Sequence, residues 1–115
     1  MIFVLADDNV LHVVNSEREL QGAFEGVDVE EGEYKFFDEA GNPLTAEFVK
    51  PNKRGKIFGM FNWVISGTYR LNVSQSGGPR LIDVLSSIGG LQANSRFSSL
   101  DEVNEFLTLR SRPTR

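Results

Sequence analysis

The chain has 115 residues, 40% of them hydrophobic and 24% charged, and its formal net charge is −4. This length and balance are typical of one soluble globular domain with a single core. Because the sequence has no cysteine, disulfides, thiolate nucleophiles, zinc ribbons and iron–sulfur sites are excluded.

The charges are unevenly distributed along the chain. Residues 7–47 contain twelve acids and two bases, whereas the chain from Lys50 onward contains ten bases and four acids. If the fold keeps these halves apart, an acidic face would steer a basic partner. If it does not, the charges mix over an ordinary solvated surface.

The amino-terminal residues 1–6 are apolar but too short for a membrane span, and Asp7 and Asp8 follow at once. We expect a strand here, pairing with residues 10–14 through a turn, and a cytoplasmic protein with no membrane contact. His12, the single histidine, falls in the second strand. It has no nucleophile motif beside it, which favours a structural or surface role.

A helix is predicted from Ser16, because Ser16 and Glu19 have the spacing of a capping box in which the Glu19 carboxylate reaches back to Ser16. Gly26 is its expected end. The acidic residues 28–33 that follow lack the alternating ligand pattern of a calcium loop, so we predict an exposed contact turn and no metal site.

Residues 33–49 are the clearest antiparallel hairpin in the sequence. Two runs of alternating apolar residues, beginning at Tyr34 and Leu44, flank a turn that contains Gly41, Asn42 and Pro43. The basic residues 50–56 then indicate a loop. With no interleaved aromatic residue and a pI near 5.0, the sequence predicts no nucleic-acid surface.

Residues 57–73 are the most apolar stretch, and we expect a strand broken near Gly59 or near residues 66–67. Met60, Phe61 and Trp63 belong either to the core or to an exposed binding patch. Residues 74–79 are interpreted as a helix entry turn, because they lack the spacing and lysine of a phosphate-binding loop.

Two further helices are predicted, over residues 79–88 and 99–110, the second with a capping box at Ser99 and Glu102. The order of elements predicts a two-layer α+β domain over residues 1–111, with a mostly antiparallel sheet of about five strands and three helices on one face. An alternative arrangement places the last two helices as a hairpin against one end of a curved sheet. Residues 112–115 are expected to form a flexible tail.

The Gly-Glu-Tyr-Lys-Phe segment at residues 32–36, leading into residues 38–44, resembles small bacterial α+β proteins and is similar in style to immunity proteins that neutralise secreted toxins. The resemblance implies stoichiometric binding of a toxin domain by acidic surface residues. It carries no individual functional residue over to this chain.

Two functions remain open from the sequence, neither requiring a cofactor. The first is a non-enzymatic module that binds a basic protein partner; the candidate partner-binding residues are Asp28, Glu30, Glu31, Asp38 and Glu39. The second is a small-ligand protein or enzyme with a cleft; its candidate residues are His12, Trp63, Tyr69, Arg70 and Arg80. Self-association through the aromatic stretch is a third possibility.

Overall fold

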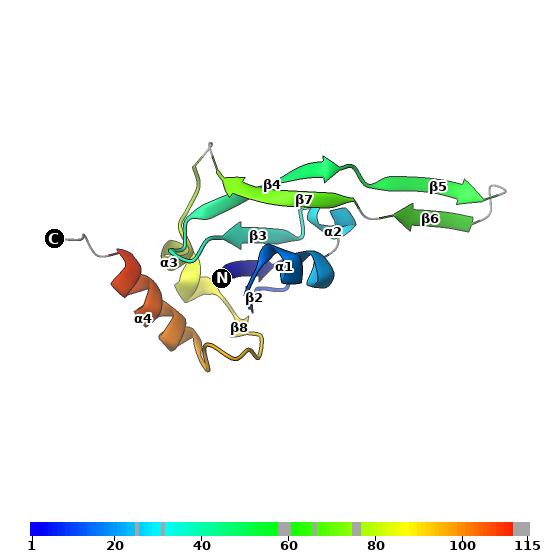
Figure 1. The fold of residues 1–115 in the computed structure, drawn as a ribbon. Helices are drawn as coiled ribbons and strands as arrows, with labels where there is room; N and C mark the ends of the chain where they lie inside the picture. Colours follow the sequence, from blue (N-terminus) through cyan, green and yellow to red (C-terminus); the bar gives the residue numbers. More distant parts are fainter. Residues whose placement is uncertain (25, 31, 58–60, 66, 75–76, 112–115) are drawn as a thin grey trace.

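The computed structural model describes residues 1–24, 26–30, 32–57, 61–65, 67–74 and 77–111, and for residues 27–28, 54–57, 61–65 and 111 the description is limited to the backbone. The protein is α+β, as predicted, with a mostly antiparallel six-stranded sheet (Figure 1). The order across the sheet is β7 (Thr68–Val73), β4 (Pro43–Lys50), β3 (Tyr34–Phe37), β1 (Ile2–Ala6), β2 (Val10–Val14) and β8 (Gly90–Leu91).

Both predicted hairpins are confirmed. Strands β1 and β2 pair in register from Ile2 opposite Val14, and their turn is closed by the Asn9 amide, which donates to the Ala6 carbonyl at 3.0 Å. Asn9 has a φ of 66°, a left-handed conformation that asparagine tolerates better than most residues. The two-residue strand β8 adds to β2 in parallel, and it was not predicted.

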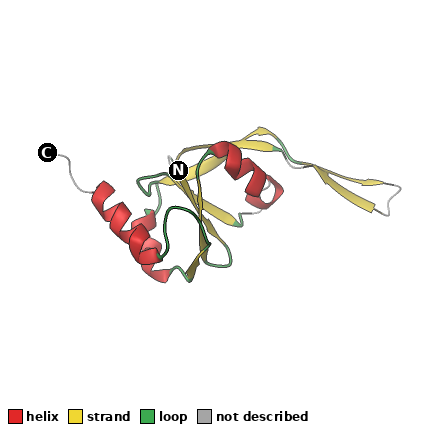
Figure 2. Cartoon of the chain, turned by 60° about the horizontal axis from the view of Figure 1, so that its bottom comes forward, coloured by secondary structure: helices red, strands yellow, loops and turns green. Residues whose placement is uncertain are grey.

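The helices lie on both faces of the sheet, so the prediction that they share one face is wrong (Figure 2). On one face Leu20 of α1 (Glu17–Ala23) and Val29 of α2 (Gly26–Glu30) pack with Val4 and Phe36. The other face is covered by α3 (Leu81–Val84), the 3₁₀ turn η1 (Leu85–Ser87) and α4 (Leu100–Ser111).

This arrangement follows from the strand alternation. Phe36 and Phe37 are adjacent and both buried, at 4% and 3% exposed, and Phe3 and Val4 are adjacent and fully buried. Because successive side chains of a strand point to opposite faces, adjacent buried residues require cover on both sides.

The helix boundaries differ in detail from those predicted. Ser16 accepts from the Glu19 amide at 3.2 Å, as expected, but the Glu19 carboxylate accepts from the Asn15 amide rather than from Ser16. Gly26 begins α2 instead of ending α1. The helix predicted from Pro79 starts at Leu81 and becomes a 3₁₀ turn after Val84.

Strands β5 (Lys53–Ile57) and β6 (Phe61–Ile65) form a separate antiparallel ribbon, which we call the arm. The arm continues the long β4–β7 ribbon and projects from the rest of the protein (Figure 1). The principal extents of the chain, with the arm included, are 62 × 28 × 23 Å. The expectation that residues 50–56 form a loop is therefore wrong for residues 53–56, which belong to β5. A break between two strands occurs at Gly67, at one of the two expected points.

Candidate functional site: a groove between strands β3 and β4

Strands β3 and β4 pair over only two positions and then separate. Phe36 lies opposite Leu44 and Phe37 lies opposite Pro43, and no other residues of β3 and β4 pair with each other. Beyond this point β3 stays paired with β1 as far as Tyr34, whereas β4 stays paired with β7 as far as Lys50. Because each strand follows its other neighbour, the sheet opens between them.

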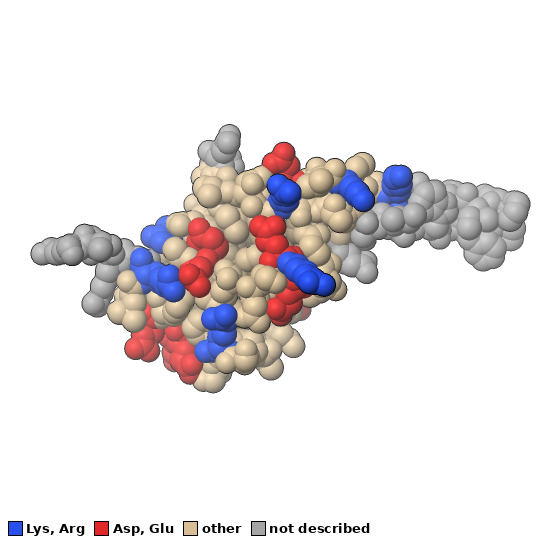
Figure 3. All heavy atoms as spheres, viewed as in Figure 1, with Lys and Arg blue, Asp and Glu red and all other residues tan. Residues whose placement is uncertain are grey.

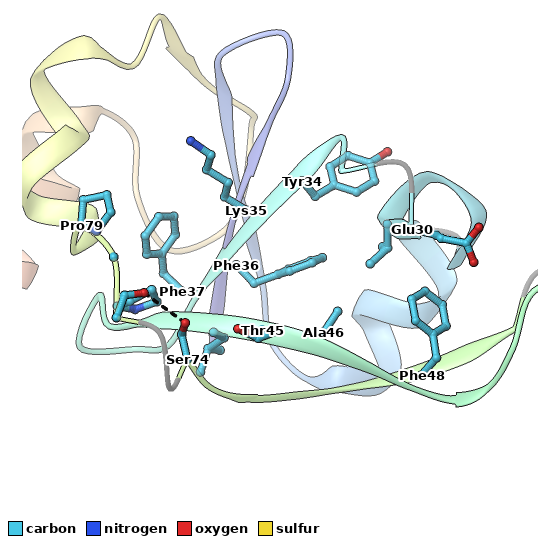
Figure 4. Close-up of a pocket in the computed structure, with 15 residues that line it drawn as sticks. Glu30, Tyr34, Lys35, Phe36, Phe37, Thr45, Ala46, Phe48, Ser74 and Pro79 are labelled. Atoms are coloured by element: carbon cyan, nitrogen blue, oxygen red, sulfur yellow. Dashed lines mark hydrogen bonds between the residues drawn. The ribbon is translucent and has the colours of Figure 1, made fainter.

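A cavity of about 490 Å³ occupies this opening (Figure 4). Its size lies within the range of ligand-binding pockets in proteins. The cavity is lined by residues of β3, of β4 and of the end of α2, together with Ser74 and the residues before α3. The lining residues are Val29, Glu30, Tyr34, Lys35, Phe36, Phe37, Pro43, Leu44, Thr45, Ala46, Phe48, Ser74, Gly77, Gly78 and Pro79.

The edge of β4 that borders the cavity carries backbone groups with no strand partner. The Asp38 amide donates to the Asn42 carbonyl at 2.9 Å, and the Ser74 amide donates to the Pro43 carbonyl at 3.1 Å. Since the backbone groups of successive strand residues point to opposite edges, these bonds place the N–H and C=O of Ala46 and Phe48 on the β3 side. In the described part of the chain no strand pairs with that edge.

Aromatic rings build the wall of the groove on the α1 and α2 side. Tyr69 packs against Phe36 and Phe48, with ring centroids 6.0 and 5.8 Å away, and Phe24 packs edge-on against Tyr34 at 4.7 Å. Tyr34, Leu44, Ala46 and Phe48 are only partly buried by this cluster, so their apolar surface faces the opening.

The Tyr69 hydroxyl holds this wall to α1, because it donates to the Phe24 carbonyl at 2.8 Å. Burial raises the pKa of Tyr69 above its ordinary value, and the charges of Tyr34 and Glu17 add to the effect. Tyr69 therefore stays a neutral donor at physiological pH.

Polar side chains lie at both ends of the groove. Glu30 accepts from the Asn52 side chain at 2.9 Å at one end. At the other end the Ser74 hydroxyl donates to the Gly77 carbonyl at 3.0 Å. Lys35 is exposed and points away from Phe36, on the other side of β3 (Figure 4). The site is thus an apolar groove with a hydrogen-bonding edge and a few charged groups around it.

The candidate acidic residues that the structure describes do not lie together on one surface. Glu30 borders the groove, Asp28 lies beside it on α2 with its side chain outside the description, and Glu31 is outside the described residues. Asp38 and Glu39 lie past the far end of β3.

Asp38 and Glu39 also have local structural partners. Asp38 accepts from the Ala40 and Asn42 amides at 2.9 and 2.8 Å and so closes the β3–β4 turn. Glu39 forms an ion pair with Arg110 of α4 at 3.1 Å. On the face shown in Figure 3, acidic and basic side chains are interspersed rather than separated.

The residues of the predicted cleft are also dispersed. His12 and Tyr69 both contact Phe24, His12 through its ring at a centroid distance of 5.3 Å. Trp63 belongs to β6 in the arm, whereas His12 belongs to β2 in the main sheet (Figure 1). The structure therefore does not bring these residues together in one pocket.

The two arginines of that cleft lie elsewhere. Arg70 is exposed on β7. Arg80 precedes α3, where its guanidinium donates to the Ala40 carbonyl at 3.1 Å and its backbone amide donates to the Asp83 carboxylate at 3.0 Å. Met60 and the side chains of Phe61 and Trp63 lie outside the description, so the question of core or exposed patch stays open for them.

The groove residues were missed at the sequence level, although one signal was present. The second run of the central hairpin is longer than the first, and β4 has eight residues where β3 has four. A strand that outruns its partner must either find another neighbour or leave an open edge. Among the described residues no cluster of His, Asp and Glu is arranged to hold a metal ion.

An α+β sheet with an open internal groove is the class of structure that this chain defines. No protein-family model matches the chain, and neither the curated proteins nor the solved structures contain a significant match. Within the described residues, no helix combines the length and apolar character needed to cross a membrane.

Proposed function

We propose that the chain is a non-catalytic protein-binding module that holds an extended segment of its partner in the groove between β3 and β4. The observation that carries the proposal is the open edge of β4, where the backbone groups of Ala46 and Phe48 border an apolar cavity of about 490 Å³. Addition of a strand to an exposed sheet edge is a recurring mode of peptide recognition.

The lining indicates what such a segment would contain. Backbone hydrogen bonds to Ala46 and Phe48 supply affinity for any extended chain, whereas apolar surface from Phe36, Leu44 and Phe48 selects apolar side chains at alternate positions. Glu30 at the α2 end favours a cationic residue there. Binding of a basic partner through acidic residues, as an immunity or inhibitor-type protein would do, is one form of this proposal.

The test is a selection of random ten-residue peptides on the wild-type protein, repeated on Ala46→Pro. Proline removes the Ala46 N–H from the open edge and leaves the β7 side of β4 intact, a position in which proline is tolerated. We expect peptides with alternating apolar residues, and at least tenfold weaker binding of those peptides to Ala46→Pro. Glu47→Ala on the same strand is the control, because its backbone faces β7.

Recovery of no peptide would contradict the proposal. Equal binding of the selected peptides to both proteins would contradict strand addition at this edge.

A second candidate is a small apolar ligand in the same groove, favoured by the Phe, Leu, Val and Pro side chains that make up seven of the fifteen lining residues. A thermal-shift screen of small apolar compounds distinguishes the two. A compound that stabilises wild type and Ala46→Pro equally, while no peptide binds, would support the small ligand over the partner segment.

A further inference from the structure

A second cavity lies between the helical segments on the other face of the sheet. There α3, η1 and α4 cover the face opposite α1 and α2 (Figure 2). The cavity measures about 270 Å³, and we call it the helix notch. Its lining residues, all within the described part of the chain, are Ile82, Leu85, Ser86, Leu100, Asp101 and Asn104.

The helix notch has an apolar floor and a polar rim. Residues three apart on a helix share a side, which brings Ile82 next to Leu85 and Asp101 next to Asn104. Leu85 is 6% exposed, and Ile82 and Leu100 are half-buried, so they form the floor. The other three lining side chains are exposed and stand around it.

The size of the helix notch suits one side chain better than a whole small molecule. Pockets for small ligands usually measure about 300–1,000 Å³, and this cavity is smaller. A hollow that receives a single side chain of a partner is a common form of interface hot spot, and arginine is among the residues enriched there. The occupant expected from the size is therefore a side chain of another protein.

The charge at the rim selects a cationic side chain. Asp101 is the one ionisable residue among the six that line the notch. It lies in the first turn of α4 together with Glu102, whose carboxylate accepts from the Ser98 amide at 3.3 Å. The amino terminus of a helix contributes about half a positive charge, which is less than two carboxylates carry. The rim is therefore negative and complements a cation.

The acceptors at the rim suit a guanidinium better than an ammonium group. The side-chain oxygens of Ser86, Asp101 and Asn104 can all accept hydrogen bonds. Within the residues that the structure describes, none of these three side chains has a hydrogen-bond or ion-pair partner. Arginine offers five N–H donors in a planar fork, and its apolar stem covers apolar surface while the charge stays in water.

We propose that the helix notch is a docking point for an arginine side chain of a protein partner. The stem packs on the apolar floor, and the guanidinium donates to Asp101 and to the other acceptors at the rim. This contact does not rest on the proposed strand addition, because the notch and the groove share no lining residue and are covered by different helices.

The test is an NMR titration of the wild-type protein with N-acetyl-arginine N-methylamide, an arginine with peptide-like ends. We expect saturable shifts of the Leu85 and Leu100 methyl signals in the millimolar range and no shift for Leu44 in the groove. The citrulline analogue, which has a neutral urea group in place of the guanidinium, should bind about fivefold more weakly, because an exposed ion pair contributes at most about this factor.

Two carboxylate-to-amide changes on α4 supply the matched variants. Asp101→Asn should weaken binding of the arginine probe about fivefold. Glu105→Gln removes the same charge one helical turn further on, at a residue that does not line the notch, and should leave binding nearly unchanged. The comparison of arginine with citrulline on the wild-type protein tests the proposal even if Asp101→Asn does not fold.

Several results would overturn the proposal. They include the absence of saturable shifts at Leu85 and Leu100, equal binding of the citrulline analogue, and unchanged binding to Asp101→Asn. Tighter binding of free arginine than of the blocked form would assign the notch to the amino acid rather than to a partner's side chain. Tighter binding of N-acetyl-leucine N-methylamide would assign it to an apolar side chain.

Discussion

The hydroxyl of Tyr69 donates to the carbonyl of Phe24, and this 2.8 Å bond ties strand β7 to the end of helix α1 across the core. Tyr69 is 3% exposed and Phe24 is 6% exposed, so neither group can exchange its partner for water. The bond also supports the aromatic wall of the groove, since Tyr69 packs on Phe36 and Phe48.

Replacement of Tyr69 by Phe should destabilise the fold while keeping the ring. The Phe24 carbonyl loses its buried donor, which costs about 1–3 kcal/mol in the free energy of unfolding. Urea denaturation measures this loss. Thr68→Ala, an exposed change on the same strand, should stay within about 0.5 kcal/mol of wild type, and an equal effect of both changes would contradict this role of the hydroxyl.

Tyr69 also predicts how stability depends on alkaline pH. Burial raises the pKa of Tyr69 in the folded state above its ordinary value of 10.0, so above that pH the unfolded chain releases a proton that the folded chain retains. The contribution of Tyr69 is complete below pH 10 and is lost as the pH rises further. Unfolding free energies at pH 9 and 11 should fall more for wild type than for Tyr69→Phe, and parallel curves would contradict this.

Two glycines predict opposite responses to alanine. A Cβ at Gly22, in the exposed part of α1, meets no atom within 4 Å, and alanine should stabilise the helix by about 0.5–1 kcal/mol. A Cβ at Gly67 would lie 1.9 Å from the Lys50 carbonyl, so alanine there must displace the backbone at the arm root. Thermal denaturation should show a higher midpoint for Gly22→Ala and a lower one for Gly67→Ala.

The hairpins of this fold were predictable because their signals are local. Alternating apolar residues and a turn of Gly41, Asn42 and Pro43 define the β3–β4 hairpin, and its pairing of Phe36 with Leu44 follows. The capping role of Ser16 was predictable for the same reason, since it depends on residues three apart.

The placement of the helices and the groove depends on contacts distant in sequence. Leu20 belongs to the core cluster that covers Phe36, and Leu107 belongs to the cluster that covers Phe37. These two leucines come from opposite ends of the chain. The groove exists because β4 continues along β7 while β3 continues along β1, and no local pattern states which neighbour a strand follows. The spacing of apolar residues therefore predicted the strands and helices, but it did not predict the opening between β3 and β4.

Asn52 should hold the arm in place, because its side chain bonds Gly26, Gly67 and Glu30 at once. Asn52→Ala removes these bonds and should cost about 1–3 kcal/mol if the Gly67 amide is left without a partner. The loss should be concentrated in the arm, with faster amide hydrogen exchange in β5 and β6 than in β1. Asn72→Ala, which removes one exposed bond to Glu47, is the control and should leave exchange in the arm unchanged.

The contribution of α4 can be measured by comparing two leucines two residues apart. Leu107 is fully buried and would lie 3.2 Å from a Cβ on Gly41, whereas Leu109 is 62% exposed. Leu107→Ala should lower the free energy of unfolding by about 2–5 kcal/mol, because it leaves a cavity in the core that also contains Phe3 and Val103. Leu109→Ala should change it by less than about 0.5 kcal/mol. Since both substitutions change helix propensity equally, a similar loss in both variants would mean that α4 does not pack on the sheet in solution.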